Sequence, residues 1–302
     1  MAIYLGIDGG GTKTTCVVAD EHSVLGSATC GGSNITRLGE ARVREALYAA
    51  VREACTRAKV NPENIESTCV GLSGAGRPEV RDAVSLMMAN IVGGRVQVVS
   101  DLETSLEAAF GGGAGVIIIG GTGSIAYGRD ANGRTARAGG WGLAISDEGS
   151  GEWIGRAAVS AVLSAKDAGE DPPLLADILQ LWNLSTLDEL VRHANASPPP
   201  NFASLFPTVL KAAEAGQGPA LKVLRTAGTA LAGLVNNVIG RLFADGGGVP
   251  VAMSGGVFRQ SELVRQVFYN KLNAEFPHAT VNPTVVDPVR GALELARKAI
   301  PR

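Results

Sequence analysis

One early stretch, YLGIDGGGTKTTCVVAD, places an aspartate, three glycines, a threonine and a lysine in succession. Asp8 can hold Mg²⁺ directly or through water, because carboxylate oxygens are ligands that this ion accepts. Gly10 and Gly11 let the backbone come close to a phosphate, whose oxygens backbone N–H groups can bind. Thr12 and Lys13 can donate hydrogen bonds to phosphoryl oxygens. The stretch therefore predicts a phosphate-binding turn with a metal ligand beside it.

The order of residues in this turn argues against two common phosphate loops. A Walker A loop needs Gly-Lys-Ser/Thr at the start of a helix, whereas here the lysine follows Thr12 and the next residues favour a strand. A dinucleotide-binding fingerprint needs GxGxxG before a helix, but its third glycine position is Thr14. The remaining interpretation is a hairpin turn between strands at 3–8 and 14–19 that faces a phosphate. The alternative is a glycine-rich hairpin without a ligand.

A second stretch, GVIIIGGTGSIAYG, repeats this design later in the chain. An apolar run at 116–119 leads into a glycine turn, and the chain runs back at 125–128. Two such hairpins predict an internal duplication, in which two related domains each give one loop to a shared cleft. Chance similarity of two glycine-rich turns is the alternative. The residues of the second turn are Gly121, Thr122, Gly123 and Ser124.

The elements that must position these turns follow from apolar patterning, which alternates between strand and helix and predicts an α/β fold. The predicted strands, besides the four in the two hairpins, are 69–72, 96–100, 250–253 and 280–286. The predicted helices are 39–59, 79–91, 101–110, 148–166, 172–182, 186–195, 219–243, 261–275 and one that begins after Pro288.

Composition and charge limit the class of protein. The chain has 302 residues, 45% hydrophobic and 19% charged, which fits a folded protein of two domains. A net charge of −2 gives no reason to expect nucleic acid or an acidic membrane as a partner. With no secretory signal and no apolar stretch of roughly 18 residues, we expect a cytoplasmic protein. The four cysteines form no CxxC pair, and reduced thiols are expected at Cys16, Cys30, Cys55 and Cys69.

Six segments, GIDGGGTKT, VVSDLETSLEAAFGG, GTGS, GGWG, SDEGSGEWIG and SGGVF, occur in this order. In this respect the chain resembles the BadF/BadG/BcrA/BcrD ATPase family and the N-acetylglucosamine kinases, within the acetate and sugar kinase/Hsp70/actin superfamily. The resemblance implies two ribonuclease-H-like α/β domains with an interdomain cleft. The first domain is expected at 1–113, with a final helix at 288–300 packing back on it. The second is expected at 114–287, with helical additions.

The resemblance also implies how ATP is bound. Thr12 and Thr122 match the family's threonines that contact the ATP phosphates. The SGGVF segment matches the adenosine loop, and a looser match places one alanine beside the base. The nucleotide contacts implied in these later segments are Gly255, Gly256, Arg259 and Ala215.

The resemblance implies sugar-binding residues in the same way. Asp101 matches the catalytic carboxylate of the kinases and can accept the proton of the sugar hydroxyl; its alternative is a helix N-cap. Asp147 matches a sugar-binding position, and its alternative is stabilisation of a helix dipole. Ile125 stands where vertebrate N-acetylglucosamine kinases have Asn, which puts one hydrogen bond to the sugar in doubt. The other implied sugar contacts are Asn34, Ser73, Ser124, Gly140, Trp141, Gly142 and Leu143.

These features predict an ATP-dependent kinase of an amino sugar, with N-acetylglucosamine phosphorylated at its 6-hydroxyl and with ATP and Mg²⁺ as cofactors. N-acetylmuramic acid and glucosamine are the alternative acceptors. A different class, the ATPase activators of acyl-CoA dehydratases, holds an iron–sulfur cluster on cysteines after the first domain, but no cysteine follows Cys69 here. A non-catalytic sensor is disfavoured because Asp8, Thr12, Asp101 and Thr122 are all present. The sequence leaves a homodimer open.

Overall fold

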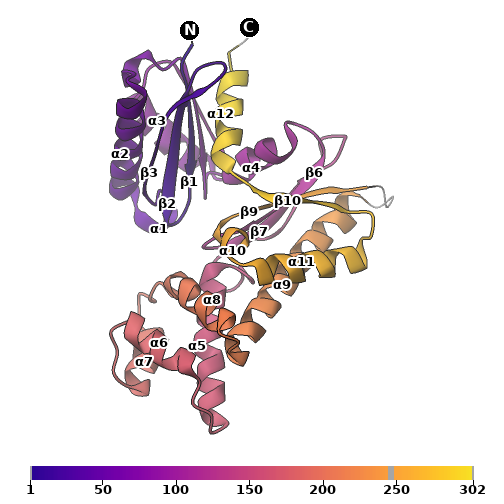
Figure 1. Ribbon diagram of the computed structural model, residues 1–302. Coiled ribbons are helices and arrows are strands. Elements are labelled where there is room, and N and C mark those ends of the chain that lie inside the picture. The colour runs from indigo at the N-terminus through magenta and orange to yellow at the C-terminus, as the bar shows by residue number, and fades with distance from the viewer. Residues whose placement is uncertain (1, 244–247, 301–302) are drawn as a thin grey trace. The chain divides into compact units, whose positions relative to one another are not determined.

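The computed structural model describes residues 2–243 and 248–300 (Figure 1). The chain divides into two compact units, one of Met1–Ile117 with Val286–Arg302 and one of Ile118–Val285. The expected domain boundaries, at 113/114 and 287/288, lie within a few residues of these divisions and stay a prediction. Within the described residues, no helix is both long and apolar enough to cross a membrane.

The first unit is built on a five-stranded sheet in the order β3-β2-β1-β4-β5. Strands β1 and β2 form the predicted hairpin, and β3 continues it in antiparallel fashion. Strand β4 runs parallel to β1, and β5 runs parallel to β4. The carboxyl ends of β1, β4 and β5 therefore meet at one edge of the sheet. The strands are β1 (Tyr4–Gly9), β2 (Lys13–Ala19), β3 (Val24–Gly31), β4 (Ser67–Leu72) and β5 (Arg95–Ser100).

Helices cover both faces of this sheet (Figure 1). Successive side chains of a strand point to opposite faces, so Ile7 packs in one core cluster with Leu47 and Val84, and Tyr4 packs in another with Leu293. The first cluster lies under α2 and α3, and the second lies under α12. The helices are α1 (Ile35–Leu38), α2 (Glu40–Ala58), α3 (Pro78–Ala89), α4 (Asp101–Phe110) and α12 (Pro288–Lys298).

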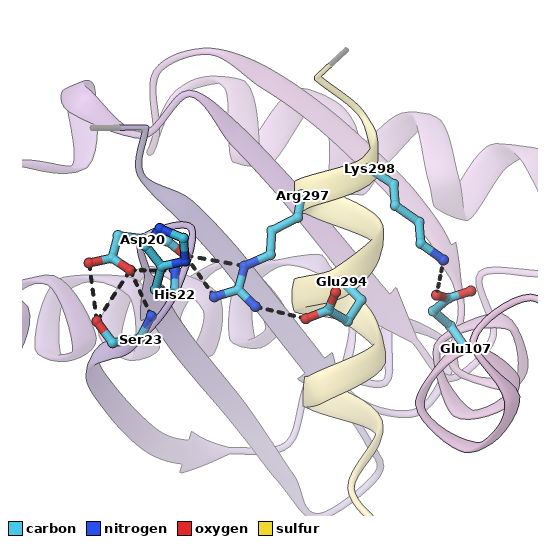
Figure 2. Close-up of polar contacts among 7 residues, drawn as sticks. All are labelled: Asp20, His22, Ser23, Glu107, Glu294, Arg297 and Lys298. Carbon is cyan, nitrogen blue, oxygen red and sulfur yellow. Dashed lines mark hydrogen bonds and ion pairs between the residues drawn. The ribbon is translucent and has the colours of Figure 1, made fainter. Parts of the chain in front are cut away.

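Polar contacts hold the end of α12 against the early part of the chain (Figure 2). Arg297 donates hydrogen bonds from Nε and Nη2 to the backbone oxygen of Asp20, at 3.1 and 2.6 Å. The Asp20 carboxylate accepts the backbone N–H of Ser23 at 2.7 Å, which fixes the turn that receives Arg297. On the other side of the helix, Lys298 pairs with Glu107 of α4 (Figure 2). The last helix thus covers one face of the sheet that the early strands form.

The close approach of α12 and α4 depends on Gly291. A Cβ at this position would lie 1.9 Å from the backbone oxygen of Thr104 and 2.7 Å from the backbone nitrogen of Ala108. Gly291→Ala therefore forces the helices apart, and we expect it to lower the free energy of unfolding by about 1–3 kcal/mol in urea denaturation.

Gly240→Ala is the matched control for this packing. Gly240 is an exposed glycine of a helix in the second unit, and an added Cβ there meets nothing within 4 Å. We expect this variant to gain up to about 1 kcal/mol, because alanine favours helix over glycine. Equal free energies of unfolding for the two variants would contradict the proposed effect of crowding.

The other sheet has five strands in the order β10-β9-β6-β7-β8. Numbered from its own first strand, this order is the same 3-2-1-4-5 arrangement as in the first sheet. The repeated order confirms the predicted fold class and explains why the sequence contains two similar hairpins. The strands are β6 (Gly115–Gly120), β7 (Ser124–Arg129), β8 (Thr135–Gly139), β9 (Pro250–Ser254) and β10 (Thr280–Val286).

Helices make up most of the rest of the second unit, as the patterning predicts. The long α9 packs against α11, α5 and the strands β7 and β8. The helices are α5 (Gly151–Asp167), α6 (Pro173–Leu181), α7 (Leu187–Ala194), α8 (Phe206–Glu214), α9 (Gly218–Leu242), α10 (Gly256–Gln260) and α11 (Glu262–Glu275).

Apolar patterning did not indicate five of these elements, and it placed the start of one helix too early. Strands β3 and β8 are edge strands with several exposed positions, so they lack the apolar runs that marked the central strands. The short helices α1, α8 and α10 were also not predicted. Helix α5 begins at Gly151 rather than at 148, because the Ser150 side chain caps it by accepting the N–H of Trp153 at 3.1 Å.

Candidate active site

The first candidate turn joins β1 to β2 as a tight hairpin. The N–H of Gly10 donates to the backbone oxygen of Lys13 at 2.9 Å, and the oxygen of Gly10 accepts the N–H of Ser33 at 3.0 Å. Asp8 lies half-buried next to the turn, and the side chains of Thr12 and Lys13 are exposed on it. The predicted strand–turn–strand is confirmed, and it carries these polar side chains at the carboxyl end of β1.

The glycines of this turn serve different purposes. A Cβ at Gly9 would lie 2.1 Å from Ser33 Oγ and 2.3 Å from Leu72 Cδ2, so packing alone requires a glycine there. At Gly10 the nearest atom to an added Cβ is 3.5 Å away, which is ordinary contact distance. Packing therefore does not explain Gly10, and the close approach of a ligand stays the prediction for this position. Since its N–H closes the turn, Gly10 would contribute room for a phosphate rather than a hydrogen bond.

Three more predicted residues gather at the same sheet edge. Ser73 follows β4, and its N–H donates to the backbone oxygen of Gly9 at 3.0 Å. Asn34 Nδ2 donates to Ser73 Oγ at 3.3 Å, and the Ser73 side chain is also hydrogen-bonded to Asp101 at the end of β5. The structure thus brings Asn34, Ser73 and Asp101 together, close to the turn that follows Asp8.

Asp101 is the first residue of α4 but does not cap it. The cap is Ser100, whose side chain accepts the N–H of Glu103 at 3.3 Å, while the Glu103 carboxylate accepts the N–H of Ser100. The N-cap alternative for Asp101 is therefore wrong. The sequence held the signal for this, because Ser-x-x-Glu before an apolar helix is a capping box. With capping assigned to its neighbour, the Asp101 carboxylate remains for another role.

The surroundings of Asp101 change its acidity. Burial raises the pKa of this carboxyl to about 6, and hydrogen bonds from Leu102, its own N–H and Ser73 partly oppose that rise. A carboxylate with such a pKa is ionised near neutral pH yet basic enough to accept a proton from a hydroxyl group as its oxygen attacks. Asp101 thus has the properties expected of a general base.

The second candidate turn joins β6 to β7 in the other unit. The N–H of Gly121 donates to the backbone oxygen of Gly123 at 2.9 Å, and the oxygen of Gly121 accepts the N–H of Gly151 at 2.8 Å. The first turn of α5 therefore lies directly against this loop. The loop is completed at its far end by Ser124, whose Oγ donates to the backbone oxygen of Glu148 at 2.8 Å.

Asp147 is held beside this second turn. Its Oδ1 accepts the N–H of Ser124 at 3.3 Å, and a Cβ at Gly123 would lie 3.1 Å from its Oδ2. The residue has a left-handed backbone, with φ of 67°, and is buried, which raises the pKa of its carboxyl. Asp147 lies before the Ser150 cap and outside the first turn of α5, where the dipole effect is concentrated, so the helix-dipole alternative is not supported. A buried carboxylate in an uncommon backbone conformation is typical of a functional site.

The segment 140–143 forms an exposed loop in the same unit. Trp141 is 65% exposed, and the Arg137 guanidinium stacks on its ring at 4.1 Å, so Trp141 does not belong to the core. A Cβ at Gly140 would lie 2.5 Å from Ile125 Cδ1, which places Ile125 directly under the loop. The predicted sugar contacts of this unit thus lie around the β6–β7 turn.

The SGGVF segment also reaches this turn. Gly255 has φ of 100°, and a Cβ there would lie 2.2 Å from the backbone oxygen of Gly120, at the end of β6. Gly256 then begins α10, which carries Arg259 on its exposed side. Ala215 lies exposed after the end of α8, and its contact with the base stays a prediction.

A metal site can be tested against the donor set. Within residues 2–243 and 248–300, no group of three or more His, Cys, Asp or Glu side chains could hold an ion. Mg²⁺ in phosphate-transfer sites keeps several waters and binds one or two carboxylates together with substrate phosphates. A single carboxylate at Asp8, beside a turn with exposed Thr12 and Lys13, fits that mode of binding and does not fit a dedicated protein cage.

Comparisons with known proteins relate the chain to one family and to kinases of amino sugars. The model of the BadF/BadG/BcrA/BcrD ATPase family matches residues 5–296. The N-acetylmuramic acid/N-acetylglucosamine kinase of Clostridium acetobutylicum is 32% identical, over 98% of this chain and 99% of the relative. The N-acetyl-D-glucosamine kinase of Dictyostelium discoideum is 30% identical, over 97% of each chain. A solved structure from Chromobacterium violaceum, of a candidate N-acetylglucosamine kinase, superposes with a TM-score of 0.75 at 26% identity, over 98% of this chain and 99% of that one.

The fold and the family match define the class of this protein. The chain belongs to the BadF/BadG/BcrA/BcrD ATPase family, as its six segments indicate.

Proposed function

We propose that this protein transfers the γ-phosphoryl group of ATP to the 6-hydroxyl of N-acetylglucosamine, with Asp101 as the general base. The observation that carries the proposal is the position of Asp101 at the carboxyl end of β5. There it is hydrogen-bonded by Ser73, which also contacts Asn34, and burial raises its pKa to about 6. The enzyme class is the less specific statement: the chain is an ATP-dependent sugar kinase, related over nearly its full length to kinases of amino sugars.

In the proposed reaction, the side chains of the first unit act on the acceptor. Phosphoryl transfer needs in-line positioning and charge neutralisation more than covalent chemistry. The Asn34 amide and the Ser73 hydroxyl would orient the sugar, and Asp101 would accept the hydroxyl proton as the oxygen attacks. Asp8 would hold Mg²⁺, which neutralises charge on the phosphates when it is bound. Thr12 and Thr122 are the proposed phosphate contacts of their respective units.

Contacts in the second unit would select the acceptor and bind the nucleotide. Asp147 and the backbone of 140–143 are proposed to bind sugar hydroxyls, and Gly255, Gly256 and Arg259 to bind adenosine. Because Ile125 replaces an amide with an apolar side chain, acceptors without a matching acetamido contact become competitive. Glucosamine lacks the acetyl group and N-acetylmuramic acid keeps it, so these two acceptors are the ones to compare. A cytoplasmic location and a homodimer stay predictions.

A coupled assay of ADP release tests this function. The purified protein with ATP and Mg²⁺ is given N-acetylglucosamine, N-acetylmuramic acid, glucosamine or glucose, each over a range of concentrations. We expect the highest kcat/KM with N-acetylglucosamine and no ADP release without a sugar. ADP release that no sugar stimulates would contradict the proposal and favour an ATPase with another role.

The pKa of Asp101 predicts how the activity depends on pH. A general base must be ionised, so kcat/KM for the sugar is expected to rise as the pH increases through about 6. The free energy of unfolding changes with pH in the opposite direction to the activity. Because the pKa of Asp101 is higher in the folded than in the unfolded state, the contribution of this carboxyl to stability is lost as the pH rises through about 6. Ser73→Ala removes a hydrogen bond that lowers the pKa, so the acidic limb of the profile should move to higher pH. An unchanged limb in this variant would argue against Asp101 as the titrating group.

A further inference from the structure

Helix α5 carries an acidic and a basic side chain one turn apart that the sequence analysis did not single out. Glu152 stands in its first turn with only 5% of its side chain exposed, and Arg156 follows with 39% exposed. Charged side chains are rarely buried without partners, because removing a charge from water is costly. The groups that Glu152 and Arg156 bind therefore indicate which segments the two side chains hold in place.

Glu152 joins the second turn to a distant part of the same unit. Its backbone N–H donates a hydrogen bond to the backbone oxygen of Thr122, with 3.4 Å between nitrogen and oxygen. Its Oε2 accepts the N–H of Ala203 at 3.0 Å, in the short turn Phe202–Leu205, and its Oε1 lies 3.9 Å from Arg156 Nη2. Glu152 thereby fixes α5 to the turn at Phe202–Leu205.

Arg156 connects the same helix to the exposed loop 140–143. Its Nη1 donates to the backbone oxygen of Leu143 at 2.9 Å, and its guanidinium lies 5.3 Å from the centre of the Phe202 ring. Helix α5 and the turn Phe202–Leu205 are in direct contact, since a Cβ at Gly155 would lie 1.9 Å from the backbone oxygen of Phe202. The guanidinium is therefore held by a carboxylate and an aromatic ring while it binds the loop.

The other polar contacts of this loop are local: the backbone oxygen of Gly142 accepts the N–H groups of Ile145 and Ser146 at 3.2 and 2.9 Å, and Arg137 stacks on Trp141. Gly140 and Gly142 have φ of 69° and 113°, which only glycine adopts readily, and the side chain of Trp141 between them is 65% exposed. A loop with exposed side chains and glycines on both sides of the tryptophan gains little from burial. Its hydrogen bond to Arg156 is charge-assisted, and such bonds are stronger than neutral ones.

We infer that Glu152 and Arg156 are positioning residues, which set the backbone of the 140–143 loop relative to the Thr122 turn without touching either substrate. This inference rests on the proposed function, in which that loop binds the sugar. Loss of the pair would release the loop and weaken sugar binding, whereas the nucleotide contacts at Gly255 and Arg259 would keep their geometry.

The test compares variants of α5 by steady-state kinetics. Arg156→Met keeps much of the side-chain length and removes the donors, and we expect it to raise the KM for N-acetylglucosamine by about 10- to 100-fold while the KM for ATP changes little. Glu152→Gln, which keeps an acceptor for Ala203, and Arg156→Lys, which keeps a charge, should show smaller increases. The matched control is Lys166→Met on the same helix, whose ion pair with the exposed Asp171 lies in another part of the unit.

Hydrogen exchange of the peptide covering 139–146 gives a reading that does not depend on activity. We expect faster exchange in Arg156→Met than in wild type and no change in Lys166→Met. Unchanged exchange in Arg156→Met, or an equal rise in both KM values, would overturn the inference. If the wild-type protein turns over no sugar, the proposed function fails, and the exchange experiment still decides whether Arg156 fixes the loop.

Discussion

Replacing Asp101 by asparagine is expected to lower kcat by about 10²–10⁴-fold, the usual contribution of a general base. The amide keeps the shape of the side chain and can still bond with Ser73, but it cannot accept the proton of the attacking hydroxyl. ATP binding should be close to that of wild type, because the proposed nucleotide contacts lie in other segments. Initial rates with N-acetylglucosamine and a calorimetric titration with ATP measure the two effects separately.

An exposed aspartate provides the control for this result. Asp82 lies exposed on α3 in the same unit, so Asp82→Asn removes the same charge from the unit without changing the candidate site. We expect this variant to keep the wild-type kcat. If Asp101→Asn retains turnover within about tenfold of wild type, Asp101 is not the base and another acceptor of the proton must be found.

The second large effect is expected at Asp147. Asp147→Asn tolerates the left-handed backbone but loses the charge, and we expect kcat/KM for the sugar to fall by about 10- to 150-fold, as for a lost hydrogen bond to a charged group. In Asp147→Ala the kcat/KM for the sugar should fall further, because alanine at φ of 67° also strains the loop that holds Ser124. Initial rates at varied sugar concentration, together with thermal unfolding of each variant, measure both effects.

Asn183→Ala separates backbone strain from the loss of the carboxylate. Asn183 is exposed and has φ of 53°, so alanine there meets a similar backbone penalty at a site that holds no proposed sugar contact. We expect this variant to be less stable to thermal unfolding but to keep the wild-type kcat/KM for the sugar. A similar loss of kcat/KM in Asn183→Ala and Asp147→Ala would mean that Asp147 acts only through the stability of the fold.

Local signals in the sequence predicted much of the fold. The central strand β6, GVIIIG, is buried on both faces and is therefore a continuous apolar run. Strand β4 is equally buried but begins with Ser67 and Thr68, so only its second half, CVGL, gave this signal. The two glycine turns lie between strands in the structure, as their spacing indicated. The edge strands β3 and β8 escaped prediction because their partly exposed positions hold small or polar residues, for which apolar periodicity gives no signal.

The candidate site was predictable only as separate pieces. The sequence motif around Asp101 indicated this residue. Only the structure shows that the Ser73 side chain is hydrogen-bonded to both Asp101 and Asn34, which lie far apart in the sequence. The same limit applies to Arg156, whose bond to Leu143 depends on how a helix packs against a loop. Such contacts arise from tertiary packing, which no local pattern encodes.

The most direct test of the account identifies the product of the reaction. The wild-type protein is incubated with ATP, Mg²⁺ and N-acetylglucosamine, ADP is quantified, and the sugar product is examined by phosphorus and carbon NMR. We expect ADP and sugar phosphate in equal amounts, with phosphorus coupled to carbon 6 of the sugar. Phosphate on another oxygen, or ADP with free phosphate and unchanged sugar, would contradict the proposed reaction.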